Sequence, residues 1–189
     1  LSGGDIAMIA GNAGELALAA LACAQAGVAL LPLDPLSAEA RQPVLQALGG
    51  ARVKHVAALP AMPDTVETND STAAPAADSA ADALALVIAT SCSEGAPKAV
   101  MLTQTNLDAA AAASNARLPL RAGDLWLDCL PLQHIGGMAI LYRCLRAGAT
   151  LLLHEGFAAD AVWRDLHDYP VTHISLVPAM LARLLDVAG

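Results

Sequence analysis

The polar segment from Thr90 to Lys98 is the part of this sequence best suited to chemistry. It reads Thr-Ser-Cys-Ser-Glu-Gly-Ala-Pro-Lys. Hydroxyl and backbone N–H groups can donate hydrogen bonds to phosphate oxygens, Gly95 permits close approach of the backbone, and Lys98 adds a positive charge. The segment therefore predicts a phosphate-binding loop. A polar turn between two strands explains the same composition, and the residues alone leave both interpretations open.

A second candidate site surrounds His134, within the sequence Leu-Pro-Leu-Gln-His-Ile-Gly-Gly of residues 130–137. The histidine follows a strand-like apolar run, and Gly136 and Gly137 allow the backbone to turn sharply before a helix. An imidazole at this point predicts a pocket residue that hydrogen-bonds a ligand. A lone histidine in a loop is more often structural, so both interpretations stay open.

The elements around these residues predict an α/β fold. Ala83–Ala89 is an apolar run that predicts a buried strand, so Thr90–Lys98 follows the carboxyl end of that strand, where open α/β sheets bind ligands. Strands that alternate with helices indicate parallel-rich β-sheets flanked by helices. Other strands are predicted at 5–10, 28–33, 53–59, 99–102, 125–130, 150–153 and 173–177. Helices are predicted at 15–26, 40–48, 103–117, 140–147 and 158–167, and from 178 onward.

Residues 60–82 are predicted to form an exposed linker. This stretch is rich in proline, alanine and small polar residues and has no periodicity, so it cannot bury enough apolar area to offset the cost of ordering. The linker separates a first α/β lobe, 1–59, from a phosphate-loop lobe, 83–189. Because the chain starts at Leu1 without methionine and stops soon after an apolar helix-like segment, we interpret it as a fragment.

The acidic composition argues against two classes of partner. The chain has 18 Asp and Glu against 10 Lys and Arg, which gives a net charge of −8. Nucleic acids and anionic membrane surfaces both require a basic protein surface, so neither is predicted as a partner. The longest apolar stretch, Leu16–Leu33, is interrupted by Gln25 and Gly27, which favours a helix followed by a strand over a membrane span.

The four cysteines do not predict a metal site or a nucleophile. Cys23, Cys92, Cys129 and Cys144 form no CxxC pair, and none lies beside a histidine at metal-ligand spacing. No histidine is near Cys92 in the sequence to activate its thiol. We therefore expect reduced thiols in a cytoplasmic protein, without a metal bound by protein ligands.

Taken in order, the motifs resemble those of the adenylate-forming enzymes, the AMP-binding or acyl-CoA synthetase family. TSCSEGAPKAVMLTQTNL, residues 90–107, is similar to the phosphate-loop signature of that family. LPLQHIGGMAILYRCLRAGATLLL, residues 130–153, matches a motif in which histidine follows Pro-Leu, and residues 172–186 match a V-P-x-x-L element. Residues 4–35 are similar to an early strand–helix–strand unit. Within the family, PLQHIGGMAILYR and SLVPAMLARLL are most similar to o-succinylbenzoate–CoA ligases of menaquinone synthesis, with other aryl- or fatty-acyl–CoA ligases as the alternatives.

This resemblance implies the fold of an acyl-CoA synthetase N-terminal domain, truncated, and a two-step ligase reaction. A small carboxylic acid attacks ATP to give acyl-AMP, and CoA then displaces AMP, with Mg²⁺ on the phosphates. The family motif implies that His134 borders the acyl pocket, that Gly136 and Gly137 shape its wall, and that Lys98 and His134 are catalytic. The residues it implies around the β- and γ-phosphates are Thr90, Ser91, Ser93, Glu94, Gly95 and Lys98.

Departures from the family pattern bear on activity. Cys92 and Ala99 replace glycines, Glu94 places a carboxylate where a hydroxyl residue is usual, and Gln104 replaces a histidine. The family's adenine-binding segment, ribose-binding aspartate and C-terminal lysine domain are also absent. We therefore expect this chain alone to be inactive and to need the remainder of the ligase as partner, with a homo-oligomer as the other possibility. The alternative is a non-catalytic homologue that retains the fold and a ligand pocket.

Overall fold

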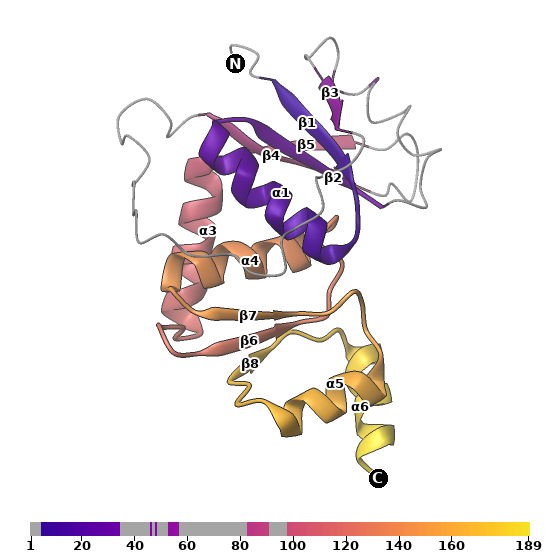
Figure 1. Cartoon of the computed structure of the whole chain (residues 1–189). Helices are drawn as coiled ribbons and strands as arrows, with labels where there is room; N and C mark the ends of the chain where they lie inside the picture. Colours follow the sequence, from indigo (N-terminus) through magenta and orange to yellow (C-terminus); the bar gives the residue numbers. More distant parts are fainter. Residues whose placement is uncertain (1–4, 35–45, 47, 49–52, 57–82, 91–97) are drawn as a thin grey trace. The chain divides into compact units, whose positions relative to one another are not determined.

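The computed structural model describes residues 5–34, 46, 48, 53–56, 83–90 and 98–189 (Figure 1). These residues fall into two compact units. Unit 1 comprises Leu1–Gly11 and Leu18–Thr105, and unit 2 comprises Asn12–Ala17 and Asn106–Gly189. In the described part of the chain, no helix is both long enough and apolar enough to cross a membrane.

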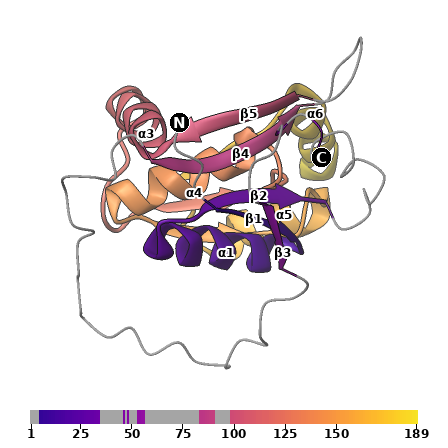
Figure 2. The same cartoon turned by 90° about the horizontal axis from the view of Figure 1, so that it is seen from above.

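Unit 1 is built on a five-stranded sheet with the order β3-β1-β2-β4-β5. Its strands are β1 (Ile6–Ala10), β2 (Ala29–Leu33), β3 (Val53–Val56), β4 (Leu84–Thr90) and β5 (Lys98–Thr103). Strands β3, β1, β2 and β4 are parallel neighbours, whereas β5 returns antiparallel to β4 at the edge of the sheet (Figure 2). All five residues of β2 are buried, as expected for the interior of a parallel sheet.

Helix α1 (Ala13–Ala26) connects β1 to β2. Asn12 and Glu15 close its first turn reciprocally: the Asn12 side chain accepts the Glu15 N–H, and the Glu15 carboxylate accepts the Asn12 N–H, each at 2.9 Å. Gly27 ends the helix with a φ of +65°, a conformation that glycine adopts without steric cost.

Unit 2 carries a three-stranded parallel sheet with the order β7-β6-β8. The central strand β6 (Leu125–Asp128) pairs with β7 (Thr150–Leu153) on one side and with β8 (His173–Ile174) on the other. The helices are α3 (Gln104–Arg117), α4 (Ile135–Ala147), α5 (Ala159–Asp168) and α6 (Pro178–Ala188). Figure 1 shows α4 on one face of this sheet, and α5 and α6 on the other.

Successive side chains of strand β6 point to opposite faces of the sheet, and both faces are covered by helices. Trp126 packs with Ile140 and Cys144 of α4, whereas Leu127 packs with Val162 of α5 and Leu184 of α6. Two apolar cores therefore meet at one strand, and that strand leads directly into the segment that carries His134.

The predicted α/β fold of parallel-rich sheets flanked by helices is confirmed, and the strand at 150–153 and the helix beginning at Pro178 occur where expected. The predicted division at residues 60–82 stays a prediction; strand β4 pairs with β2 and thus lies in the same sheet as the first strands. The predicted strands at 125–130 and 173–177 end earlier, at Asp128 and Ile174. Residues 60–82 and most of the helix predicted at 40–48 lie outside the described residues.

Candidate functional site

The two ends of the predicted phosphate loop lie opposite each other. Thr90 is the last residue of β4 and Lys98 the first of β5, and the antiparallel register pairs them. The Thr90 hydroxyl donates a hydrogen bond to the Lys98 carbonyl oxygen at 3.3 Å. Lys98 is exposed and Thr90 is half-buried. The Thr90 proton is engaged in that bond, so the accessible Lys98 ammonium supplies the donor chemistry that a phosphate group requires at this position.

The remaining predicted loop residues, Ser91, Ser93, Glu94 and Gly95, lie outside the described residues, as does Cys92. Their assignment to the phosphates of a ligand therefore stays a prediction. The register fixes the ends of the connection, since Thr90 and Lys98 are cross-strand partners. The family-like segment therefore begins at the carboxyl end of β4, and the strand β5 that follows it is the antiparallel neighbour of β4, as the sequence predicted.

His134 is the residue that precedes α4, and its side chain makes no capping hydrogen bond to that helix. Its N–H bonds the Pro131 carbonyl oxygen at 3.1 Å, and its own carbonyl accepts the Met138 N–H at 3.1 Å. The residue is exposed. An imidazole at a helix N-terminus, where free N–H groups carry partial positive charge, favours an anionic group such as a carboxylate.

The two glycines after His134 have different structural requirements. A Cβ atom at Gly137 would lie 2.7 Å from the carbonyl oxygens of both Leu130 and Pro131, so the first turn of α4 packs on backbone that cannot move aside. A Cβ at Gly136 would lie 3.6 Å from a Leu130 methyl group, which is an ordinary contact. Close packing thus explains why position 137 requires glycine. The role of Gly136 and Gly137 in a pocket wall stays a prediction.

Asp128 is a residue that the sequence reasoning missed. It ends β6 and is 0% exposed. One carboxylate oxygen, Oδ1, accepts the Leu130 N–H at 2.9 Å, whereas Oδ2 is buried and has no hydrogen-bond partner among the described residues. Burial raises the pKa of Asp128 from 3.8 to about 7, against the lowering effect of the Leu130 hydrogen bond. The available signal was an aspartate in the otherwise apolar run Leu125–Leu130.

The neighbouring thiols are buried and poorly reactive. Burial, together with the nearby Asp128 charge, raises the pKa of Cys129 to about 11 and that of Cys144 to about 11. Cys23 is also buried, and all three are free. These cysteines are therefore core residues, as their sequence context predicted.

His154 and Glu155, which follow β7, are structural in this molecule. His154 Nε2 lies 3.0 Å from an Asp165 carboxylate oxygen on α5, and the His154 N–H bonds the Asp128 carbonyl at 2.9 Å. The Glu155 carboxylate accepts the N–H of Ala13 at 2.9 Å, in the first turn of α1. Since carboxylates already meet the free N–H groups at the start of α1, that helix end is unfavourable for an anionic ligand.

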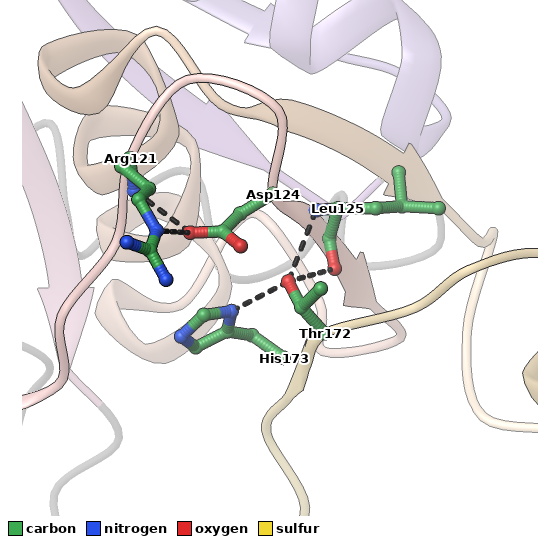
Figure 3. Close-up of polar contacts among 5 residues, drawn as sticks. All are labelled: Arg121, Asp124, Leu125, Thr172 and His173. Atoms are coloured by element: carbon green, nitrogen blue, oxygen red, sulfur yellow. Dashed lines mark hydrogen bonds and ion pairs between the residues drawn. The ribbon is translucent and has the colours of Figure 1, made fainter.

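The amino-terminal edge of the unit 2 sheet is held by a separate set of contacts (Figure 3). The Thr172 hydroxyl lies 3.1 Å from the Leu125 nitrogen, 3.2 Å from its oxygen and 2.8 Å from His173 Nδ1. Arg121 donates its backbone N–H to Asp124 at 2.9 Å. His173 also stacks on Trp126, with ring centroids 5.1 Å apart. These contacts join β8 to β6 and account for His173 as a structural residue.

Comparison with known families agrees with this arrangement. A sequence profile of the AMP-binding enzyme family matches residues 2–189. The chain belongs to the AMP-binding enzyme family.

Individual relatives place it near one group of ligases. It is 40% identical over 103 residues to a 2-succinylbenzoate–CoA ligase of Bacillus cereus, covering 54% of this chain and 21% of that protein. A Bacillus licheniformis protein of the same name is 41% identical over 103 residues, with 54% and 22% covered. The chain thus spans well under two thirds of these relatives.

Solved structures show the same relationship. The o-succinylbenzoate CoA synthetase from Bacillus subtilis, in complex with the acyl-adenylate intermediate OSB-AMP, has a TM-score of 0.75 at 26% identity, covering 97% of this chain and 52% of that one. The same synthetase with ATP and magnesium ion has a TM-score of 0.73 at 27% identity, with 97% and 53% covered. The N-terminal domain of FACL13 from Mycobacterium tuberculosis shares the fold, with a TM-score of 0.75 at 24% identity and 96% and 52% covered.

Proposed function

We propose that this chain is part of an ATP-dependent acyl- or aryl-CoA ligase that activates a carboxylate as acyl-AMP and transfers the acyl group to CoA. The observation that carries the proposal is the pairing of Thr90 with Lys98 across β4 and β5, the two residues at the ends of the family's phosphate-loop segment. Membership of the AMP-binding family and the 40% identity to a 2-succinylbenzoate–CoA ligase support it.

In this proposal Lys98 and Thr90 bind the phosphates of ATP, together with Ser91, Ser93, Glu94 and Gly95. Magnesium supplies additional positive charge to those phosphates. Lys98 is exposed and carries the charge that a phosphate needs, so the described part of the loop fits this ligand.

The acid substrate is placed against His134, with Gly136 and Gly137 in the wall of its pocket. The exposed imidazole and the N-terminus of α4 both favour a carboxylate. The similarity to 2-succinylbenzoate–CoA ligases favours an aryl acid of that kind, and hence a role in menaquinone synthesis. We further propose a cytoplasmic location, which the free thiols of Cys23, Cys129 and Cys144 support.

Activity is proposed for a longer polypeptide that contains this chain, because the relatives are much longer than the region matched. The test measures pyrophosphate release with ATP, magnesium and a panel of aryl and fatty acids. We expect release from the longest natural polypeptide that contains these residues and none from the 189 residues alone. Lys98→Ala should abolish release, whereas Arg146→Ala, which removes an exposed cation from α4, should leave it unchanged.

The alternative is a non-catalytic homologue that retains the fold and a ligand pocket, and Glu94 favours it because a carboxylate in the loop opposes phosphate binding. Absence of pyrophosphate from the longest polypeptide with every acid, together with measurable binding of an acid or a nucleotide, would establish this alternative. Release that survives Lys98→Ala would show that the loop does not act as proposed.

A further inference from the structure

We infer that Asp128 is a positioning residue, which fixes the turn from β6 to α4 and through it the placement of the His134 imidazole. This inference rests on the proposed function, because it assigns the placed imidazole to the acid substrate. Asp128 itself is fully buried and touches no substrate, so it acts through the backbone that follows it.

A short connection joins β6 to α4. Six residues separate Asp128, the last residue of β6, from Ile135, the first of α4. Asp128 Oδ1 holds the Leu130 N–H at 2.9 Å, which is a side-chain-to-backbone bond of the kind that organises turns. It is the first contact after the strand that sets the direction of the chain.

Backbone hydrogen bonds continue the turn through Pro131 and His134 into α4. The Pro131 carbonyl oxygen accepts the His134 N–H at 3.1 Å, and the His134 carbonyl accepts the Met138 N–H at 3.1 Å. Gly137 brings the first turn of α4 against the carbonyl oxygens of Leu130 and Pro131. A displacement of Leu130 is therefore transmitted to the backbone of His134.

Burial of Asp128 at this position is costly for stability. Its carboxyl group is buried, and Oδ2 lacks a hydrogen-bond partner among the described residues. An apolar residue in this strand would avoid the cost of removing a carboxyl group from water. A buried polar group that is only half satisfied calls for an explanation, and the bond to Leu130 provides one.

The charged and titratable groups around Asp128 do not replace that bond. On α4, Cys144 and Arg143 lie on the face toward β6, where Arg143 covers the Trp126 ring. After β7, the His154 side chain is bonded to Asp165 of α5, and on β8 His173 stacks on Trp126. Asp128 therefore positions the turn through Oδ1, which accepts the Leu130 N–H. An asparagine side chain retains an oxygen that can accept this bond.

The test compares Asp128→Asn with Asp128→Ala in the 189-residue chain, with Asp186→Ala as a control at an exposed carboxylate of α6. Heteronuclear NMR follows the Leu130 amide and the His134 ring, while calorimetry measures binding of 2-succinylbenzoate and of Mg-ATP. We expect Asp128→Asn and the control to keep the His134 ring signals and the acid affinity. Asp128→Ala should displace both NMR signals and weaken acid binding about tenfold, the effect of losing one well-made interaction, with ATP affinity unchanged.

Unchanged Leu130 and His134 signals in Asp128→Ala would overturn the inference, and so would an Asp128→Asn variant as impaired as the alanine variant. If Asp128→Ala does not fold, Asp128→Val serves the same comparison, since valine suits a buried strand. Failure of 2-succinylbenzoate to bind even the unaltered chain would count against the proposed acid site, while the NMR signals would still decide whether Asp128 positions His134.

Discussion

The buried carboxyl group of Asp128 should make the free energy of unfolding depend on pH. Its pKa is about 7 in the folded protein and 3.8 in the absence of burial, so the folded state retains the proton over a range in which the unfolded state releases it. A group that binds more protons when folded makes the free energy of unfolding fall as pH rises. The loss begins near pH 4 and is complete above pH 7.

The size of this effect follows from the same two values. Each pKa unit between the folded and unfolded states corresponds to about 1.4 kcal/mol, so ionisation of Asp128 removes about 4 kcal/mol of folding free energy in full. This is a large part of the ~5–15 kcal/mol by which typical domains are stable. Asp128→Asn keeps an acceptor for the Leu130 N–H and cannot ionise, so it isolates the effect of charge.

The assay is urea denaturation at several pH values from 4 to 8, followed by circular dichroism. The contributions of all other ionisable groups are common to both proteins. The quantity to compare at each pH is therefore the free energy of unfolding of Asp128→Asn minus that of the unaltered chain. We expect that difference to grow in favour of the asparagine variant by about 4 kcal/mol from pH 4 to pH 8. Asp186→Asn, at an exposed carboxylate, serves as the matched control. Parallel stability curves for Asp128→Asn and the unaltered chain would refute the reasoning.

Three further predictions follow from other features. Gly137→Ala should destabilise the chain by about 1–3 kcal/mol through overpacking, whereas Gly136→Ala should be neutral or stabilising by up to about 1 kcal/mol. Chemical denaturation measures both changes, and equal effects would contradict the packing argument. Cys129 and Cys144 should stay unmodified by iodoacetamide at pH 8 until the chain unfolds, and mass spectrometry of the folded protein detects any exception. Glu94→Thr in the longest natural polypeptide should tighten Mg-ATP binding about tenfold by removing a like charge from the loop; an unchanged affinity by calorimetry would remove that carboxylate from the phosphate site.

Much of the fold was accessible from local pattern. The apolar runs of β1, β2 and β4 predicted buried strands, and Gly27 marked the end of α1, where its φ of +65° is observed. The return of β5 after the Thr90–Lys98 segment was also predicted, since a strand, a polar turn and a second apolar run form a hairpin locally. Such features depend on residues close together in the sequence.

The parts that sequence did not provide depend on distant residues. The pairing of Leu86 in β4 with Leu30 in β2 places the hairpin in the first sheet, and no local pattern encodes that choice. Asp128 was missed because an aspartate at the end of an apolar strand is compatible with exposure, and only the packing around β6 buries it. The partner of His154, Asp165, is likewise known only once β7 and α5 pack together.

The central place of β6 has a consequence for how the chain opens. Strand β6 is hydrogen-bonded to β7 and β8 and covered on both faces, so its amides should exchange with solvent deuterium only in the largest opening events, whereas the two-residue edge strand β8 can detach in smaller ones. His134 lies six residues beyond Asp128, the last residue of β6, and immediately precedes α4. The turn that carries His134 therefore follows the strand of unit 2 whose amides should exchange most slowly. Local opening at the edge strand β8 should leave the conformation of this turn unchanged.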